Sequence, residues 1–226
     1  MILKSLYFDL NRNEYPDEYG YDLLLKSRYY CNYIERTVFK PLKWKTLDFD
    51  RISIKFSDTA TTPTYDVNSF KVLCITAKFD KKEYEQAANS NVADFFIANI
   101  ERILPSIATD EINLPITEIR NANKQFVLDG YINKWLYEKK NNKDLKTTAF
   151  LYCELTVEAF KLTLQIMREN NLVYDKVILV EDPDPVAYHY KFKDIVFTDH
   201  SVIITHKLSF GNLIEVNINK LKNETT

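Results

Sequence analysis

Glycine is scarce in this sequence, which has only Gly20, Gly130 and Gly211 among its 226 residues. The phosphate-binding loop of nucleotide hydrolases, the dinucleotide-binding fingerprint and the nucleophile elbow of serine hydrolases each need several glycines within a few residues. Those glycines let the backbone turn sharply or approach a ligand closely. No segment of the chain supplies such a group, so these three classes of site are excluded.

Cysteine is also scarce, and its distribution excludes a disulfide framework. Cys31, Cys74 and Cys153 are odd in number, far apart and surrounded by apolar or aromatic residues. This pattern predicts reduced, buried thiols in a cytoplasmic protein and neither a disulfide nor a zinc site. Apolar surroundings raise the pKa of a thiol, and no serine or threonine stands in an activating motif. We therefore expect no nucleophile for covalent catalysis.

The chain lacks an excess of either charge and lacks a long apolar run. Thirty Lys and Arg residues face 32 Asp and Glu residues, a net charge of -2, which predicts no nucleic-acid partner. The most apolar stretch, residues 172–180, contains Asp175 and Lys176, so no segment approaches the roughly 20 apolar residues that span a bilayer. Lys4 and Asp9 interrupt the N-terminus too early for a secretory signal. We expect a soluble cytoplasmic protein without a membrane partner.

Hydrophobic residues make up 46% of the chain, enough for a substantial core. Most of the aromatic residues are Tyr and Phe. Tyr29, Tyr30, Tyr33 and Tyr152 have rings that could stack on nucleic-acid bases, but a nucleic-acid groove also needs clustered Lys and Arg. Because the basic residues are interspersed with acids, we expect these four side chains to pack in the core.

The first half of the chain mixes strand and helix patterns. Apolar residues recur at four-residue spacing over residues 21–39, which predicts an amphipathic helix that Pro41 ends. A strand over 21–39 is the alternative, since Tyr and Ile have high β-propensity. The other segments predicted for this half are strands at 2–10, 47–56 and 70–79, a loop at 57–69, and helices from Asp80, at 92–104 and at about 117–140.

The second half alternates apolar and polar residues with a period of two. Phe160, Leu162, Leu164 and Ile166 are separated by polar residues, as a strand with one buried face requires. We predict strands at 148–155, 159–167, 172–180, 187–197, 202–207 and 212–218. The turns between them, including one at residues 209–211, are short and built from residues that accept tight bends.

These segments predict one α+β domain over residues 1–226. In it a helical, mixed N-terminal half packs on a C-terminal antiparallel β-meander of up to six strands. The charged segment 139–144 is the candidate boundary, and it would separate possible lobes at 1–142 and 143–226.

All three histidines, His189, His200 and His206, fall in the predicted C-terminal sheet near several carboxylates. A metal-dependent hydrolase would need such ligands to converge on one point at about 2 Å. The spacing does not require this, and histidines at the surface or half-buried in the sheet are the favoured explanation of the pattern. We predict no metal, no cofactor and no catalytic residue.

Residues 181–185, Glu-Asp-Pro-Asp-Pro, are the most distinctive sequence in the chain. Three carboxylates stiffened by two prolines form a negative patch beside aromatic residues. The patch is typical of a surface that meets a basic partner, where charge guides the encounter and aromatic rings supply contact area. A solvated turn is the alternative. The predicted partner-binding residues are Glu181, Asp182, Asp184, Tyr188 and Tyr190.

Taken together, these exclusions favour a non-enzymatic protein that binds another protein. Our concrete hypothesis is a bacterial immunity protein that neutralises a toxin by covering the toxin's basic active site. It rests on analogy with compact, charge-balanced α+β proteins, not on a motif. The alternatives are a metal-dependent hydrolase built on the three histidines and a structural subunit of a larger assembly.

Overall fold

The computed structural model describes residues 1–208 and 211–221, and it is an α+β protein as predicted. The chain forms two compact units, Met1–Ile132 and Asn133–Thr226. The division comes before the charged segment 139–144, because that segment belongs to a hairpin of the second unit. Whether the two units behave as a single domain stays a prediction. None of the described helices is both long enough and apolar enough to cross a membrane.

The first unit is built on a four-stranded sheet in the order β1-β2-β4-β3. Strands β1, β2 and β4 run parallel, and β3 runs antiparallel to β4 at the edge. The strands are β1 (Ser5–Leu10), β2 (Arg51–Ser57), β3 (Thr64–Val67) and β4 (Val72–Lys78). The predicted loop at 57–69 therefore contains a short strand, whose polar sequence and exposed side chains give no apolar alternation.

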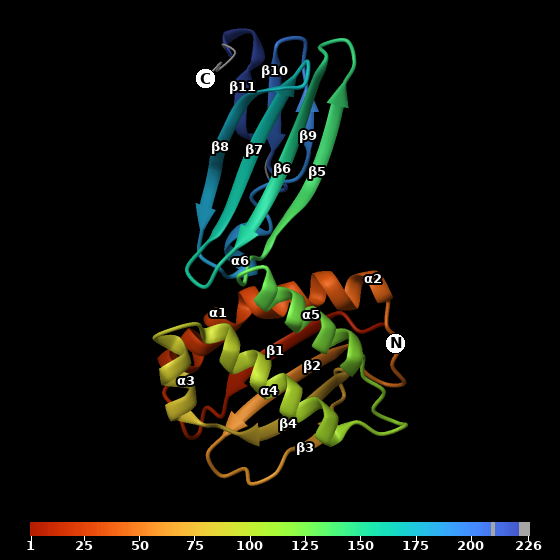
Figure 1. The fold of residues 1–226 in the computed structure, drawn as a ribbon, viewed down its shortest axis with the longest axis vertical. Coiled ribbons are helices and arrows are strands. Elements are labelled where there is room, and N and C mark those ends of the chain that lie inside the picture. The colour runs from red at the N-terminus through yellow and green to blue at the C-terminus, as the bar shows by residue number, and fades with distance from the viewer. Residues whose placement is uncertain (209–210, 222–226) are drawn as a thin grey trace. The chain divides into compact units, whose positions relative to one another are not determined.

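Helices occupy the connections of this unit, and Figure 1 shows α4 and α5 lying across the sheet. They are α1 (Asp17–Ile34), a π-helical segment η1 (Glu35–Phe39), α2 (Lys40–Leu42), α3 (Lys81–Ala88), α4 (Val92–Ile107) and α5 (Ile116–Leu128). Asp80 caps α3 and Asn91 caps α4, each through a side-chain oxygen that accepts a backbone N–H.

The segment 21–39 is helical, so the strand alternative is wrong. Its four-residue spacing buries Leu23, Tyr30 and Ile34 along one face. Pro41 does not lie beyond the helix but inside its last turn, because the helical backbone continues from α1 through η1 and α2 to Leu42. The chain leaves the helix at Lys43, which adopts a left-handed backbone with φ of 47°.

The core of the first unit is aromatic. The strands bury every second side chain, including Phe8 and Phe56, whose ring centroids lie 5.7 Å apart. Phe96 of α4 packs on Phe8 at 4.9 Å. The helices of this unit therefore cover the sheet of the same unit. The sequence pattern predicted strands in this half but did not predict that they form a separate sheet.

The long helix predicted at 117–140 is wrong beyond Leu128. Gly130 takes a left-handed backbone with φ of 68°, and the Tyr131 N–H donates to the Phe126 carbonyl at 2.8 Å, which closes the helix end. Residues 134–142 then form a strand. Ile132, Trp135 and Leu136 mimic helical spacing, which is why the pattern extended the helix too far.

The second unit contains two antiparallel sheets instead of one six-stranded meander. The first has the order β5-β6-β7-β8 and the second has the order β11-β10-β9; Figure 1 shows the second behind the first. The elements are β5 (Lys134–Asn142), β6 (Thr147–Leu155), β7 (Phe160–Arg168), β8 (Asn171–Glu181), α6 (Pro185–Tyr188), β9 (Ile195–Phe197), β10 (Ser201–Thr205), β11 (Asn212–Asn217) and η2 (Ile218–Lys220).

The strands predicted at 148–155 and 159–167 are confirmed as β6 and β7, and each buries alternate side chains. The strand predicted at 187–197 is wrong over most of its length, since residues 185–188 form α6 and only Ile195–Phe197 is a strand. The turn predicted at 209–211 falls partly on residues 209 and 210, which lie outside the described residues.

A polar network is buried between α1, α4 and α5. The Tyr30 hydroxyl donates to Asn123 Oδ1 at 2.9 Å, and Asn123 Nδ2 donates to Glu101 Oε1 at 3.0 Å. Tyr30 and Asn123 are almost fully enclosed. Removing the amide would take this acceptor away from a hydroxyl inside the core, where an unsatisfied polar group costs free energy.

We expect Asn123→Ala to lower the free energy of unfolding by about 1–3 kcal/mol, because it leaves a buried hydroxyl unsatisfied. Asn121→Ala is the matched control, since Asn121 lies exposed on the same helix and should cost less than about 0.5 kcal/mol. Urea unfolding of both variants measures the difference. Equal losses would contradict a structural role for the network.

Glu35 places a carboxyl group against the open edge of β1. The Leu6 N–H donates to Glu35 Oε1 at 2.9 Å. The residue as a whole is half-buried, but its carboxyl is largely enclosed. Burial raises the pKa of Glu35 from 4.5 to about 7, and the hydrogen bond from Leu6 and the charge of Arg28 only partly oppose this rise.

The raised pKa makes a prediction about stability against pH. Between pH 4.5 and 7 the folded state keeps the Glu35 proton that the unfolded chain releases, so stability falls as pH rises through this window. We expect the stability of the wild type relative to Glu35→Gln to drop by roughly 3 kcal/mol at most over that range. Urea unfolding at several pH values tests this, and parallel curves for the two proteins would refute it.

Candidate functional site

The acidic segment 181–185 forms a rigid turn between β8 and α6. Asp184 Oδ1 accepts the Val186 N–H at 3.0 Å and caps α6. Pro183 is buried and Pro185 occupies the first turn of the helix. The two prolines fix φ on either side of the cap, so the turn has few alternative conformations.

Tyr188 anchors this turn to the core of the second unit. Its ring lies 3.8 Å from the ring of Phe160 at an angle of 6°, and only 6% of the residue is exposed. The ring of Phe192 stacks on Phe160 from 5.7 Å. Tyr188 therefore supports the turn from the core side, and in this conformation its ring has little surface to offer a partner.

The remaining predicted partner residues divide between internal contacts and the surface. Glu181 forms an ion pair with Lys191, and Asp184 is the half-buried cap. Asp182 is exposed, and Tyr190 is 44% exposed. The five residues thus lie in one small region of the second unit, but their role in binding stays a prediction.

The structure adds Val186 to this region, because 76% of the residue is exposed although it is apolar. We call Asp182, Val186 and Tyr190 the turn surface. The sequence could have indicated Val186 only if the short helix after Pro185 had been recognised. Lys207 borders this surface, with its ammonium 5.6 Å from the centre of the Tyr190 ring and 3.0 Å from His189 Nε2.

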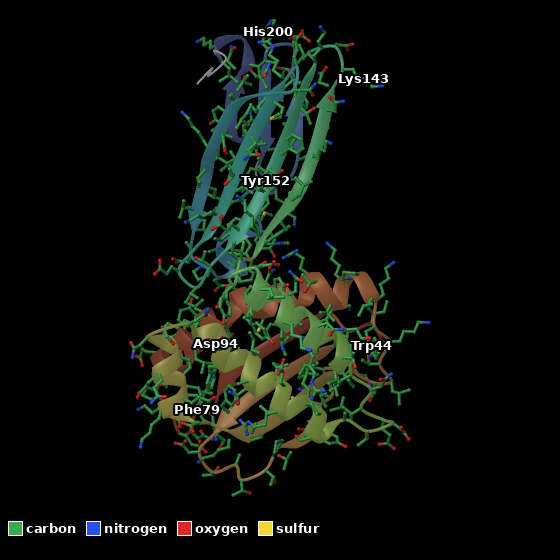
Figure 2. All side chains as sticks on the ribbon, viewed as in Figure 1. Trp44, Phe79, Asp94, Lys143, Tyr152 and His200 are labelled. Atoms are coloured by element: carbon green, nitrogen blue, oxygen red, sulfur yellow. The ribbon has the colours of Figure 1, made fainter. Side chains whose placement is uncertain are left out.

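The three histidines do not form a cluster. His189 is paired with Lys207, His200 Nδ1 lies 3.3 Å from Asn219 Nδ2, and His206 Nδ1 accepts the Leu208 N–H at 3.1 Å. Figure 2 shows His200 at one end of the second unit. Among the residues that the structure describes, no group of three His, Cys, Asp or Glu side chains has the geometry to hold a metal ion.

Two of the three cysteines are buried, as the sequence predicted for all three. Cys31 and Cys153 are buried, and burial raises the pKa of Cys153 to about 12 and that of Cys31 further. Cys74 is half-buried; burial also raises its pKa, and Asn68 Nδ2 donates to its sulfur at 3.4 Å. A thiol with a raised pKa is a poor nucleophile at neutral pH.

A carboxylate pair links β5 to β9 and was not anticipated from the sequence. Glu138 Oε2 accepts the Ile195 N–H at 3.1 Å, and Lys140 forms an ion pair with Asp194 at 3.1 Å. Burial raises the pKa of Glu138, and its hydrogen bond with Asp194 raises it further. For Asp194, hydrogen bonds with Glu138 and Lys140 outweigh burial and hold its pKa low.

A pocket of about 380 Å³ lies in the first unit, where β1 ends and α1 begins. Its lining mixes acidic, basic and aromatic side chains, among them Asp9, Arg12, Tyr15, Asp17 and Tyr21. The end of a parallel strand beside a helix start is a common place for ligands. The lining contains neither cysteine, serine nor histidine, so it offers no pair of nucleophile and imidazole base.

Comparison with models of known protein families, with curated proteins and with solved structures finds no match to this chain.

We expect Tyr188→Ala to destabilise the protein, because it removes a buried ring that stacks on Phe160. The loss in unfolding free energy should be about 3 kcal/mol or more, the range for buried aromatic residues cut to alanine. Tyr190→Ala is the matched control and should change it by less than about 0.5 kcal/mol. Thermal and urea unfolding compare the two. A mild effect at Tyr188 would mean that the turn does not depend on the stack.

Proposed function

We propose that this chain is a non-enzymatic protein that binds another protein through the turn surface. The observation that carries this proposal is the exposure of Val186 and Tyr190 on a turn held rigid from below by Tyr188. A surface that is already ordered loses little conformational entropy on binding, so more of its contact energy appears as affinity. An exposed valine and tyrosine beside a carboxylate match the mixture of apolar anchor and polar rim found in protein interfaces.

Charge favours a partner with a basic surface. Asp182 is exposed, and the hydrogen bonds and ion pairs of the described residues leave it without a basic partner, whereas Glu181 is compensated by Lys191. A partner cation can therefore meet Asp182 directly. Lys207 lies over Tyr190 and limits the negative region to the Asp182 side of the turn surface. Exposed charges of this kind act mainly on the rate of association and on partner choice.

As the more specific form of this proposal, the chain is a bacterial immunity protein that covers the basic active cleft of a toxin. Two features support it: an acidic, rigid turn that can enter a basic cleft, and described sites that offer no activated nucleophile. The metal-dependent hydrolase receives no support from the positions of the three histidines and is not proposed.

The test uses the proteins encoded by the genes next to this one, each expressed alone and together with this chain. We expect one of them to arrest growth, co-expression to restore growth, and calorimetry to show a complex with the purified chain. Asp182→Lys and Tyr190→Ala should each weaken that complex at least tenfold, because they remove the charge and the ring of the turn surface.

Asp199→Lys is the matched control, since Asp199 is an exposed acid in the turn between β9 and β10. It should leave the affinity within twofold of the wild type. If Asp182→Lys and Asp199→Lys weaken binding equally, general charge and not the turn surface carries the interaction. If none of the neighbouring proteins binds the chain, the immunity proposal fails.

A further inference from the structure

The sheet β5–β8 has a second face that does not contribute to the core of its unit. Along β6 the side chains alternate, and Ala149, Leu151 and Cys153 are buried while the residues between them keep part of their surface exposed. The register places a residue of each neighbouring strand beside each partly exposed residue of β6; Leu136, for example, lies opposite Tyr152. We call this side of the sheet the outer face; Figure 2 labels Tyr152 about midway along it.

Two aromatic rings stand side by side on the outer face. Phe150 and Tyr152 are two residues apart on β6, their ring centroids are 6.2 Å apart and their planes differ by 15°. An ammonium group from β5 lies over each ring. Lys134 Nζ is 5.7 Å from the centre of the Tyr152 ring, and Lys139 Nζ is 5.2 Å from that of Phe150.

The charges on the outer face lean positive around these rings. Glu154 lies in register between Lys134 and Lys161, which flank it on both sides. The other acid of this face, Asp175, lies on β8 and accepts a hydrogen bond from Gln165 Nε2 at 3.1 Å. Three lysines therefore share this face with two carboxylates, and two of these lysines, Lys134 and Lys139, lie over the rings.

We propose that the outer face binds a single-stranded nucleic acid along β5 and β6. Two neighbouring aromatic rings on the central strand of an open four-stranded sheet can each stack with one base. The two ammonium groups are held on flexible stems, so they can move from the rings to the phosphates when bases take their place. Asp175 repels phosphates from β8. This repulsion confines the nucleic acid to the side of the sheet that carries Lys134 and Lys139.

A protein partner explains this face less well. A dry protein interface would have to bury both ammonium groups, and lysine is depleted from the centre of such interfaces for that reason. A polynucleotide supplies an anion for every base that stacks, so it satisfies the rings and the lysines together. The net charge of the whole chain predicts no nucleic-acid partner, but net charge does not describe how charges are distributed on one face.

The experiment measures fluorescence anisotropy of labelled 12-nucleotide strands, one of thymidine and one of uridine, with the full-length protein at low salt. We expect saturable binding of at least one strand. The slope of log affinity against log salt should be about -1.4 to -2.1, as two or three phosphate contacts require for single strands. Comparison of the thymidine and uridine strands distinguishes DNA from RNA as the source of the ligand.

Two variants test the mechanism. Phe150→Ala with Tyr152→Ala should weaken binding at least tenfold, since both stacking surfaces are lost. Lys134→Glu with Lys139→Glu changes only exposed side chains, so it should fold normally, weaken binding at least tenfold and flatten the salt dependence. The matched control is Tyr190→Ala with Lys207→Ala, which removes a lysine over a tyrosine elsewhere in the second unit. It should bind the strands like the wild type.

The outcomes separate this inference from the proposed function. The control variant lacks Tyr190, so it should lose the protein partner and keep the oligonucleotide, whereas the Lys134 and Lys139 variant should do the reverse. Absence of binding by the wild type at low salt overturns the inference, as does binding that both outer-face variants retain. A third outcome is that the wild type binds no oligonucleotide and the Lys134 and Lys139 variant no longer binds a protein partner. That result would assign the outer face to a protein instead.

Discussion

Phe160 is the first residue of β7, and Tyr188 lies flat against its ring at the edge of the core of the second unit. This contact joins the four-stranded sheet to the acidic turn that follows β8. Without it the residues between Glu181 and Tyr188 would be an ordinary exposed connection, stiffened by prolines but not fixed against the sheet. The stack therefore determines which side chains of the turn are presented to solvent, and Val186 and Tyr190 are exposed because Tyr188 is not.

The arrangement of these two tyrosines differs from the one that the predicted strand at 187–197 would have given. In a strand, residues two apart share a face, and a strand at 187–197 would have turned Tyr188 and Tyr190 the same way. The structure replaces the start of that strand with a helical turn. The helix α6 ends at Tyr188, which is buried, and the turn that follows carries Tyr190 to the surface, where 44% of the residue is exposed. The acidic segment itself was correctly predicted as a turn, since its prolines and carboxylates act through local backbone geometry.

Local patterns also predicted secondary structure correctly in other segments. The pairing of distant segments could not be predicted from the sequence. The alternation over β6 and β7 predicted both strands and their buried residues, because one-sided burial imposes a period of two. The same reasoning failed at β5, where apolar residues happen to follow helical spacing and the helix is ended by Gly130. It also could not show that the C-terminal strands divide between two sheets, because pairing depends on contacts between distant segments, such as Glu138 with Ile195, that leave no periodic mark.

The outer face shows that the net charge of a chain does not describe how its charges are distributed over one surface. Strand alternation places Phe160 inward and Lys161 outward, so consecutive residues serve the core and the opposite surface. Alternation also places Phe150 and Tyr152 on the outer face, and the register shift between Leu136 and Glu138 brings Lys139 to the same face as Lys134. These groups share one face although the whole chain is slightly acidic. A nearly neutral total is then compatible with an acidic turn and a basic aromatic face on one unit. Because the two surfaces have no side chain in common, a substitution on one of them leaves the side chains of the other in place.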